Sequence, residues 1–346
     1  NFGWLNYELS GEYKETWRVA QLQATAEYDI FDGLKAKALV GYYLAYQQMN
    51  NQEYTYKLYG YDEATDTYPV IFENNNPWRE RRVGHNEELM SNIQLSYNKR
   101  FGDHNVAAVA GVESIKRDTP TSWLHAIPTA NALHLIDYET MDTYNDEGNE
   151  TEARLGWMFR GNYDYANKYL VEFSARYDGS WKFPPDHRWG FFPSFSAAWR
   201  VSEEAFMKDV KWISNFKIRL GWGTVGNDNI PNYLSLDLYE ANKYGIGNSS
   251  VTVLNPKQLR NKNLKWEGSN TTNLGIDLGF FDNRLNVTAE FFIKNTKDLL
   301  LSQSLAHITG FDSQMQNVGK IQNKGIELSL NSTNIQTRNF TWQTNF

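Results

Sequence analysis

Cysteine is absent from this 346-residue sequence, which excludes disulfide bonds and thiolate metal sites. No apolar run approaches the roughly 18 residues of a membrane-spanning helix, and the mean hydropathy is −0.62. The net charge of −7 comes without a basic stripe, which argues against a nucleic-acid-binding protein. The sequence also lacks HExxH and GxSxG motifs, and its six histidines show no paired ligand spacing. We therefore predict no enzymatic activity, no metal site and no bound cofactor.

What the sequence does contain is a long two-residue alternation, clearest over residues 153–201. Leu155, Trp157 and Phe159 would share one face of a strand, with Met158 and Arg160 on the other. Because side chains alternate faces along a β-strand, one face is apolar and aromatic and the other is polar and charged. The pattern repeats after the short turn at 166–168 and again from 194 to 201.

Alternation alone does not say which face points inward. A soluble sandwich hides its apolar face, whereas a transmembrane barrel turns that face toward lipid and keeps polar side chains in the lumen. The predicted strands run to roughly 10–13 residues, against roughly 5–6 for an average soluble strand, and the longer value suits a tilted membrane crossing. Tyr163, Tyr165 and Tyr169 gather at a short turn, where an interfacial girdle would lie. These features favour the barrel.

Connections between the predicted strands alternate for the most part between short turns and long loops. This regularity is typical of an up-and-down outer-membrane barrel. We predict an all-β chain that forms part of a large antiparallel transmembrane β-barrel, with about 13 strands in this stretch. The acidic segment 142–150 does not have EF-hand spacing, so we interpret it as surface loop rather than a calcium site. The long loops, which we expect outside the cell, lie near 48–86, 116–152, 225–269 and 296–321.

Four ordered motifs carry a family resemblance. They are RYDGSWKFPPDHRWGFFPSFSAAWRVSEEAFMKD at 176–209, WISNFKIRLGWGTVGN at 212–227, KWE…TNLGIDLGFFDNRL at 265–285 and NVGKIQNKGIELSLNSTNI at 317–335. With these motifs the sequence resembles the SusC-like branch of the TonB-dependent outer-membrane transporters, over nearly its whole length.

The resemblance implies properties that the residue pattern does not show. Such proteins are integral to the outer membrane of Gram-negative bacteria, in contact with membrane lipid, and a plugged barrel of this class has about 22 strands. They import oligosaccharides or peptides with energy delivered by TonB, commonly together with a SusD-like surface lipoprotein. We recognise no plug and no TonB box here, and we expect both to lie outside this stretch of the protein.

Two sets of residues are candidates for function. The first consists of aromatic side chains on the long loops, which could contact a ligand or a partner protein because flat rings bury apolar surface beside polar neighbours. These are Tyr54, Tyr56, Tyr59, Tyr61, Trp78, Trp123 and Trp181. The second set contains the charges predicted to face the lumen, namely Arg160, Glu172, Arg176, Arg200 and Arg219.

Two other classes of protein remain open at this point. A passive outer-membrane porin or structural barrel scaffold would share the strand pattern but lack a plug. A soluble carbohydrate-binding β-protein would instead bury the apolar face and dissolve without detergent.

Overall fold

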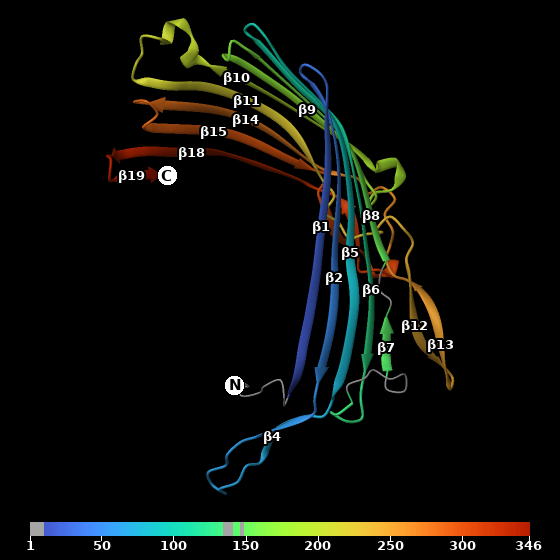
Figure 1. Cartoon of the computed structure of the whole chain (residues 1–346). Coiled ribbons are helices and arrows are strands. Elements are labelled where there is room, and N and C mark those ends of the chain that lie inside the picture. The colour runs from blue at the N-terminus through green and yellow to red at the C-terminus, as the bar shows by residue number, and fades with distance from the viewer. Residues whose placement is uncertain (1–9, 134–140, 146–148) are drawn as a thin grey trace. The chain divides into compact units, whose positions relative to one another are not determined.

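The computed structural model describes residues 10–133, 141–145 and 149–346, and almost all of their regular structure is β-strand (Figure 1). Within these residues no helix is long and apolar enough to cross a membrane. The few helical turns are short 3-10 segments: η1 (Pro185–His187), η2 (Val201–Glu203), η3 (Ala205–Met207) and η4 (His307–Thr309). The acidic segment 142–150 falls largely outside the residues whose side chains are described.

Twelve strands follow one another through a single large sheet, and β7 (Met141–Asn145) pairs with β6 in addition. The all-β, antiparallel prediction is thus confirmed. The strands of the main order are β1 (Gly11–Phe31), β2 (Leu34–Glu53), β5 (Trp78–Phe101), β6 (His104–Ala126), β8 (Asn149–Tyr165), β9 (Tyr169–Ser180), β10 (Trp189–Arg200), β11 (Ile213–Asn227), β14 (Glu267–Phe280), β15 (Leu285–Lys297), β18 (Lys320–Gln336) and β19 (Thr341–Asn345).

The loops predicted from the sequence contain more strand than expected. β2 extends to Glu53 and β6 to Ala126, well inside the predicted loops near 48–86 and 116–152. Three of the loops also carry separate two-stranded hairpins. The alternation of apolar and polar residues fades once a strand is polar on both faces, but the backbone hydrogen-bond ladder can continue. The hairpins are β3 (Tyr56–Tyr59) with β4 (Val70–Asn74), β12 (Tyr239–Ile246) with β13 (Ser249–Pro256), and β16 (Leu300–Ser304) with β17 (Ser313–Asn317).

The short turns are built as the sequence predicts. Ala166 and Asn167 have φ angles of 52° and 54°, so both central residues of that turn adopt the left-handed conformation of a tight hairpin. At the first turn Gly33 has a φ of 90°, and a Cβ on it would lie 2.8 Å from the carbonyl oxygen of Asn98. Glycine is therefore required there both for its backbone angle and for space.

The chain divides into two compact units. The first comprises Asn1–Thr25, Leu39–Ser91 and Ile115–Ala153, and it contains the hairpin β3–β4. The second comprises Ala26–Ala38, Asn92–Ser114 and Arg154–Phe346, and it contains the short turns as well as β9 to β19.

In the second unit the apolar face of the sheet is exposed rather than packed. Phe173 on β9 is 43% exposed and Leu328 on β18 is 55% exposed, while Val287 is half-buried. A soluble sandwich would cover such residues with a second sheet. The large exposed apolar surface instead requires a non-aqueous partner. In the described part of the chain, the buried apolar residues are few: Ala45, Ala126, Phe183, Val201, Ile230 and Leu264.

Candidate functional site

Ion pairs cross the strands on the polar face of the second unit. Arg160 Nη2 lies 2.6 Å from Glu172 Oε2. Arg219 donates to Asp277 at 2.7 Å and to Glu290 at 2.5 Å, so one guanidinium links β11, β14 and β15. Bidentate arginine–carboxylate bonds are strong and directional, and they fix the relative register of neighbouring strands. These arginines are compensated within the sheet itself.

Arg176 also pairs with carboxylates, nearer the long-loop end of β9. It donates to Asp178 at 2.8 Å and 3.0 Å, and it lies 3.6 Å from Glu113 on β6. The sequence predicted the arginine and its face, but the partner on a strand more than 60 residues away follows only from the fold.

Arg200 lies elsewhere, at the end of β10 beside a short turn. It donates to the carbonyl oxygen of Asn167 at 3.2 Å and to Glu203 at 2.7 Å. These bonds stabilise the turn. Arg200 therefore lies at a strand end, whereas the other predicted lumen-facing charges lie within the strands.

A carboxylate organises the aromatic side chains at this turn. Glu204 accepts hydrogen bonds from the Tyr169 hydroxyl at 2.7 Å, the Trp199 indole at 3.1 Å and the Lys168 ammonium at 3.1 Å. These three donors, the Tyr169 hydroxyl first, hold the pKa of the Glu204 carboxyl below its ordinary value. Tyr and Trp with an apolar body and a bonded polar tip suit a membrane–water interface.

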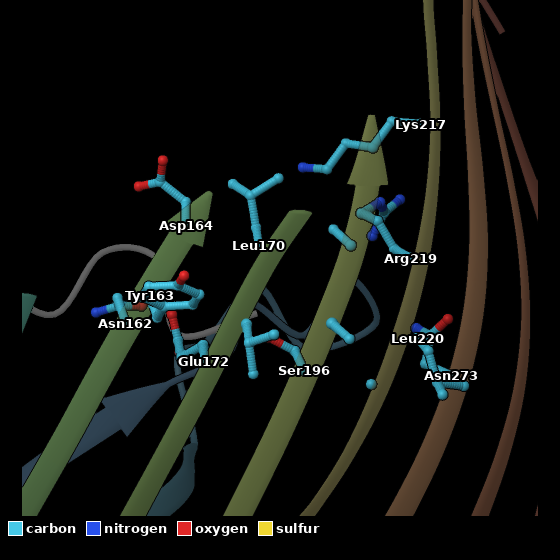
Figure 2. A pocket seen from close by; sticks show the side chains of 14 residues that line it. Asn162, Tyr163, Asp164, Leu170, Glu172, Ser196, Lys217, Arg219, Leu220 and Asn273 are labelled. Carbon is cyan, nitrogen blue, oxygen red and sulfur yellow. The ribbon is translucent and has the colours of Figure 1, made fainter. Parts of the chain in front are cut away.

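A depression of about 380 Å³ lies on the polar face near the short turns. Its floor consists of small side chains, Ser196 and Ala198 on β10 together with Gly221 on β11. Longer side chains border it, and Figure 2 shows them projecting from adjacent strands toward the same space. Those labelled in Figure 2 include Asn162, Asp164, Leu170, Glu172, Lys217, Arg219 and Asn273.

The segments that carry the family resemblance meet at the long-loop end of β9, β10, β11 and β14. Phe183 and Leu264 are buried there with Ile230, and Trp266 packs against them. Ser180 donates to Asp228 at 2.7 Å. This cluster is a dry core that ties the four strand ends together.

Ser180 and Asp228 were not candidates from the sequence. Arg154 lies 3.1 Å from Asp228, so the buried carboxylate is paired. The backbone N–H of Ser180 and the Trp266 indole both donate to the carbonyl oxygen of Arg188, at 3.1 Å and 3.0 Å. The available signal was the place of Ser180 inside the motif at 176–209 and of Asp228 directly after the motif at 212–227, rather than any periodicity.

In the first unit, two of the predicted loop aromatics contact the same histidine. The Trp78 ring stacks on His125 with centroids 5.9 Å apart, and Trp123 contacts the same histidine at 5.9 Å. Trp78 also donates its indole N–H to Glu53. Tyr54 lies under the guanidinium of Arg79, 5.1 Å from its carbon.

The other candidate aromatics have separate surroundings. Within the first unit, Tyr56 packs on Phe72 at 6.0 Å and Tyr61 on Tyr68 at 5.3 Å, both in the hairpin β3–β4 and its tip. Tyr59 is exposed on the same hairpin. Trp181 belongs to the second unit, where it contacts Tyr233 at 5.1 Å.

Arg79 fastens the segment that follows β6. Its side chain is 2% exposed and donates to the carbonyl oxygens of Leu133 and Asn131 at 2.9 Å each, and to that of Glu53 at 3.0 Å. The Asn131 amide bonds the backbone of Thr55 in turn. A planar guanidinium can serve several carbonyls at once, whereas a lysine ammonium cannot.

We therefore expect Arg79→Lys to loosen residues 127–133 without unfolding the sheet. Losing two hydrogen bonds costs about 1–3 kcal/mol locally. In the full-length protein, backbone amides of this segment should exchange with solvent roughly tenfold faster or more. A tenfold change in exchange rate corresponds to about 1.4 kcal/mol in the free energy of local opening. Arg81→Lys, on the same strand, serves as the control. Unchanged exchange in Arg79→Lys would contradict this role.

Among the described side chains, no group of three histidines or carboxylates is placed to hold a metal ion. On the polar face of the second unit, Arg160, Arg176 and Arg219 are each paired with carboxylates. Together with the exposed apolar face, this arrangement defines the wall of a membrane β-barrel, with polar side chains on one side and lipid-compatible side chains on the other.

The sequence comparisons give the family. The model for "TonB dependent receptor-like, beta-barrel" matches residues 2–346. The chain is 33% identical over 326 residues to TonB-dependent receptor P3 of Formosa agariphila, covering 93% of this chain and 31% of that protein. It is also 33% identical over 310 residues to TonB-dependent receptor SusC of Bacteroides thetaiotaomicron, covering 83% and 29%. The chain belongs to the TonB-dependent receptor β-barrel family, in its SusC-like branch.

A solved structure shows the same fold. The RagAB peptide transporter superposes with a TM-score of 0.85 at 22% sequence identity, covering 98% of this chain and 36% of that one. The chain therefore spans about a third of the length of the proteins that it matches. The family is one of outer-membrane receptors and transporters.

Proposed function

We propose that this chain is barrel wall from a SusC-like, TonB-dependent importer in the outer membrane of a Gram-negative bacterium. The observation that carries the proposal is the family match over residues 2–346. The wall that the structure describes supports it, because apolar side chains such as Phe173 and Leu328 are exposed on one face and paired charges occupy the other.

The cargo that we propose is an oligosaccharide or a peptide. SusC-like relatives and a peptide transporter of the same fold motivate these two classes. The paired arginines of the polar face support a lumen that passes neutral solutes, because their charges are already compensated by Glu172, Asp277 and Glu290. We propose that Arg160, Glu172, Arg176, Arg200 and Arg219 lie on the lumen side.

We further propose that TonB supplies the energy and that a SusD-like lipoprotein is the surface partner. The exposed aromatics of the β3–β4 hairpin, including Tyr59 and Tyr61, are suitable for contact with a protein or ligand because tyrosine is enriched at interfaces. In this proposal the chain catalyses no covalent reaction and needs no bound cofactor.

Uptake by cells that express the full-length protein tests the proposal. Accumulation of a labelled oligosaccharide or peptide cargo should fall to background when the TonB box is deleted, and it should fall strongly when the lipoprotein is removed. Unchanged uptake after TonB-box deletion would instead identify a passive porin. A protein that assembles but transports nothing in either state would indicate a scaffold.

A further inference from the structure

The aromatic ring of Phe192 lies on the polar face of the sheet, among charged and hydroxyl-bearing side chains. Phe192 on β10 shares a register position with Arg176 of β9, and Ser194 and Gly190 lie two residues away on the same face. It lines a cavity of about 480 Å³ together with Trp266. A half-buried phenyl ring at such a position leaves apolar surface open toward a polar space.

Phe192 is the outer end of a chain of rings that begins in the dry core. Phe183 is 1% exposed and lies 5.2 Å from Trp266, and Trp266 lies 5.2 Å from Phe192 in an edge-to-face arrangement of 68°. The Trp266 indole is fixed by its bond to Arg188. The inner rings therefore hold the outer one in a defined orientation.

Two glycines make room for this ring. A Cβ on Gly226 of β11 would lie 2.1 Å from Cζ of Phe192, and one on Gly190 would lie 2.4 Å from the same atom. A side chain at either position would displace the Phe192 ring from where it lies. Without these glycines the ring would have to move away from the backbone of β11.

Hydroxyl groups line the cavity beside the ring. Ser174, Ser194, Gly223 and Thr271 oppose one another in order across β9, β10, β11 and β14. The serine hydroxyls lie 2.6 Å apart, and Gly223 leaves a gap in the row toward Thr271. The hydroxyl groups of Ser174, Ser194 and Thr271 therefore offer hydrogen-bond donors and acceptors along the lining of the cavity.

The charges at the rim disfavour an anionic ligand. Arg176 is bonded to Asp178 and lies 3.6 Å from Glu113, so one cation faces two carboxylates. An anion entering the cavity would meet net negative charge. A neutral ligand with hydroxyl groups meets no such penalty.

We infer that this cavity is a binding subsite for one sugar ring of a neutral oligosaccharide. The flat face of Phe192 covers the apolar face of the ring, while Ser194, Thr271 and the Arg176–Asp178 pair bond its hydroxyl groups. Pockets that bind small ligands combine an apolar surface with a few placed polar groups in this way. The inference rests on the proposed transport function and selects the oligosaccharide over the peptide at this part of the wall.

The experiment uses the native full-length protein in detergent. An array of neutral gluco-, manno-, galacto- and xylo-oligosaccharides is compared with oligogalacturonates and with peptides of four to eight residues, and hits are measured by calorimetry. Phe192→Leu keeps apolar volume but removes the flat ring, so the affinity for a neutral oligosaccharide should fall about fivefold to tenfold.

Matched controls lie next to each changed residue on the opposite face. Phe191→Leu should leave affinity unchanged, as should Thr272→Val. Thr271→Val preserves the branched shape of the side chain but removes its hydroxyl group, so the affinity for the oligosaccharide should fall a few-fold. This variant tests the inference independently if Phe192→Leu does not assemble. Heat-modifiable gel migration verifies folding of every variant.

Equal affinity in wild type, Phe192→Leu and Thr271→Val would overturn the inference, because a packing role alone predicts that result. Binding confined to peptides or to anionic oligosaccharides would overturn it as well. These outcomes are distinct from failure of the transport proposal. If uptake does not depend on TonB but Phe192→Leu weakens oligosaccharide binding, the importer proposal is refuted and the subsite is retained. If uptake depends on TonB but the variants bind oligosaccharide with wild-type affinity, the subsite is refuted and the importer proposal is retained.

Discussion

Replacing Leu328 by arginine is expected to cost the membrane-inserted protein about 2–4 kcal/mol, if the residue lies near the middle of the bilayer. Leu328 belongs to the exposed apolar face of β18, opposite Ala289 of β15. An arginine there would have to leave water for hydrocarbon. The neighbouring Ser329 lies on the other face, opposite Thr288, so Ser329→Arg should be tolerated with much less loss.

Folding of the full-length protein into lipid vesicles measures this difference. Denaturant titrations of both variants give the free energies of unfolding, and outer-membrane fractionation reports assembly in cells. The adjacent pair is a sensitive control because the two residues share local strand geometry and differ only in the face that they occupy. A larger loss for Ser329→Arg than for Leu328→Arg would show that the Leu328 face does not contact lipid, and it would remove the basis for a transport role.

Arg219→Ala is the second substitution with a large expected effect. It leaves two carboxylates, Asp277 and Glu290, without their shared cation on a face where strands adjoin. Removing one partner of a fully buried pair costs about 3–5 kcal/mol. Because the Arg219 side chain is 32% exposed, solvent screening lowers the expected loss to about 1–2 kcal/mol.

Arg160→Ala is the matched comparison. Arg160 has one carboxylate partner, Glu172, and its side chain is 60% exposed, so a loss of less than about 1 kcal/mol is expected. Denaturant midpoints of the refolded proteins test the ranking. The double variant Arg219→Ala with Asp277→Asn should recover part of the stability, because one unpaired charge is removed. Equal losses for Arg219→Ala and Arg160→Ala would show that the three-strand link does not stabilise the wall.

The strand pattern around β8, β9 and β10 could be predicted because it depends on neighbours in sequence. Trp157 and Phe159 alternate with Met158 and Arg160, and side-chain direction in a strand has a period of two whatever the strand pairs with. The short turn at 166–168 could be predicted for the same reason, because the turn residues and the tyrosines that flank them are adjacent in the sequence.

Strand ends were less predictable. β2 and β6 extend into largely polar segments, where the alternation of apolar and polar residues is interrupted although backbone pairing continues. Arg200 shows the same limit at the other end of a strand. It stands at a polar-face position, yet it bonds the turn at Asn167 and Glu203, a contact set by where β10 stops.

The sequence by itself determined that this protein is an antiparallel membrane β-structure and, through its four motifs, which family it belongs to. Only the tertiary structure decided which charges meet, as Arg219 does with Glu290 of β15, and that the Phe192 ring fits over Gly226. The physical reason is that face and turn are properties of adjacent residues, whereas partnership and cavity shape depend on the register between strands tens of residues apart.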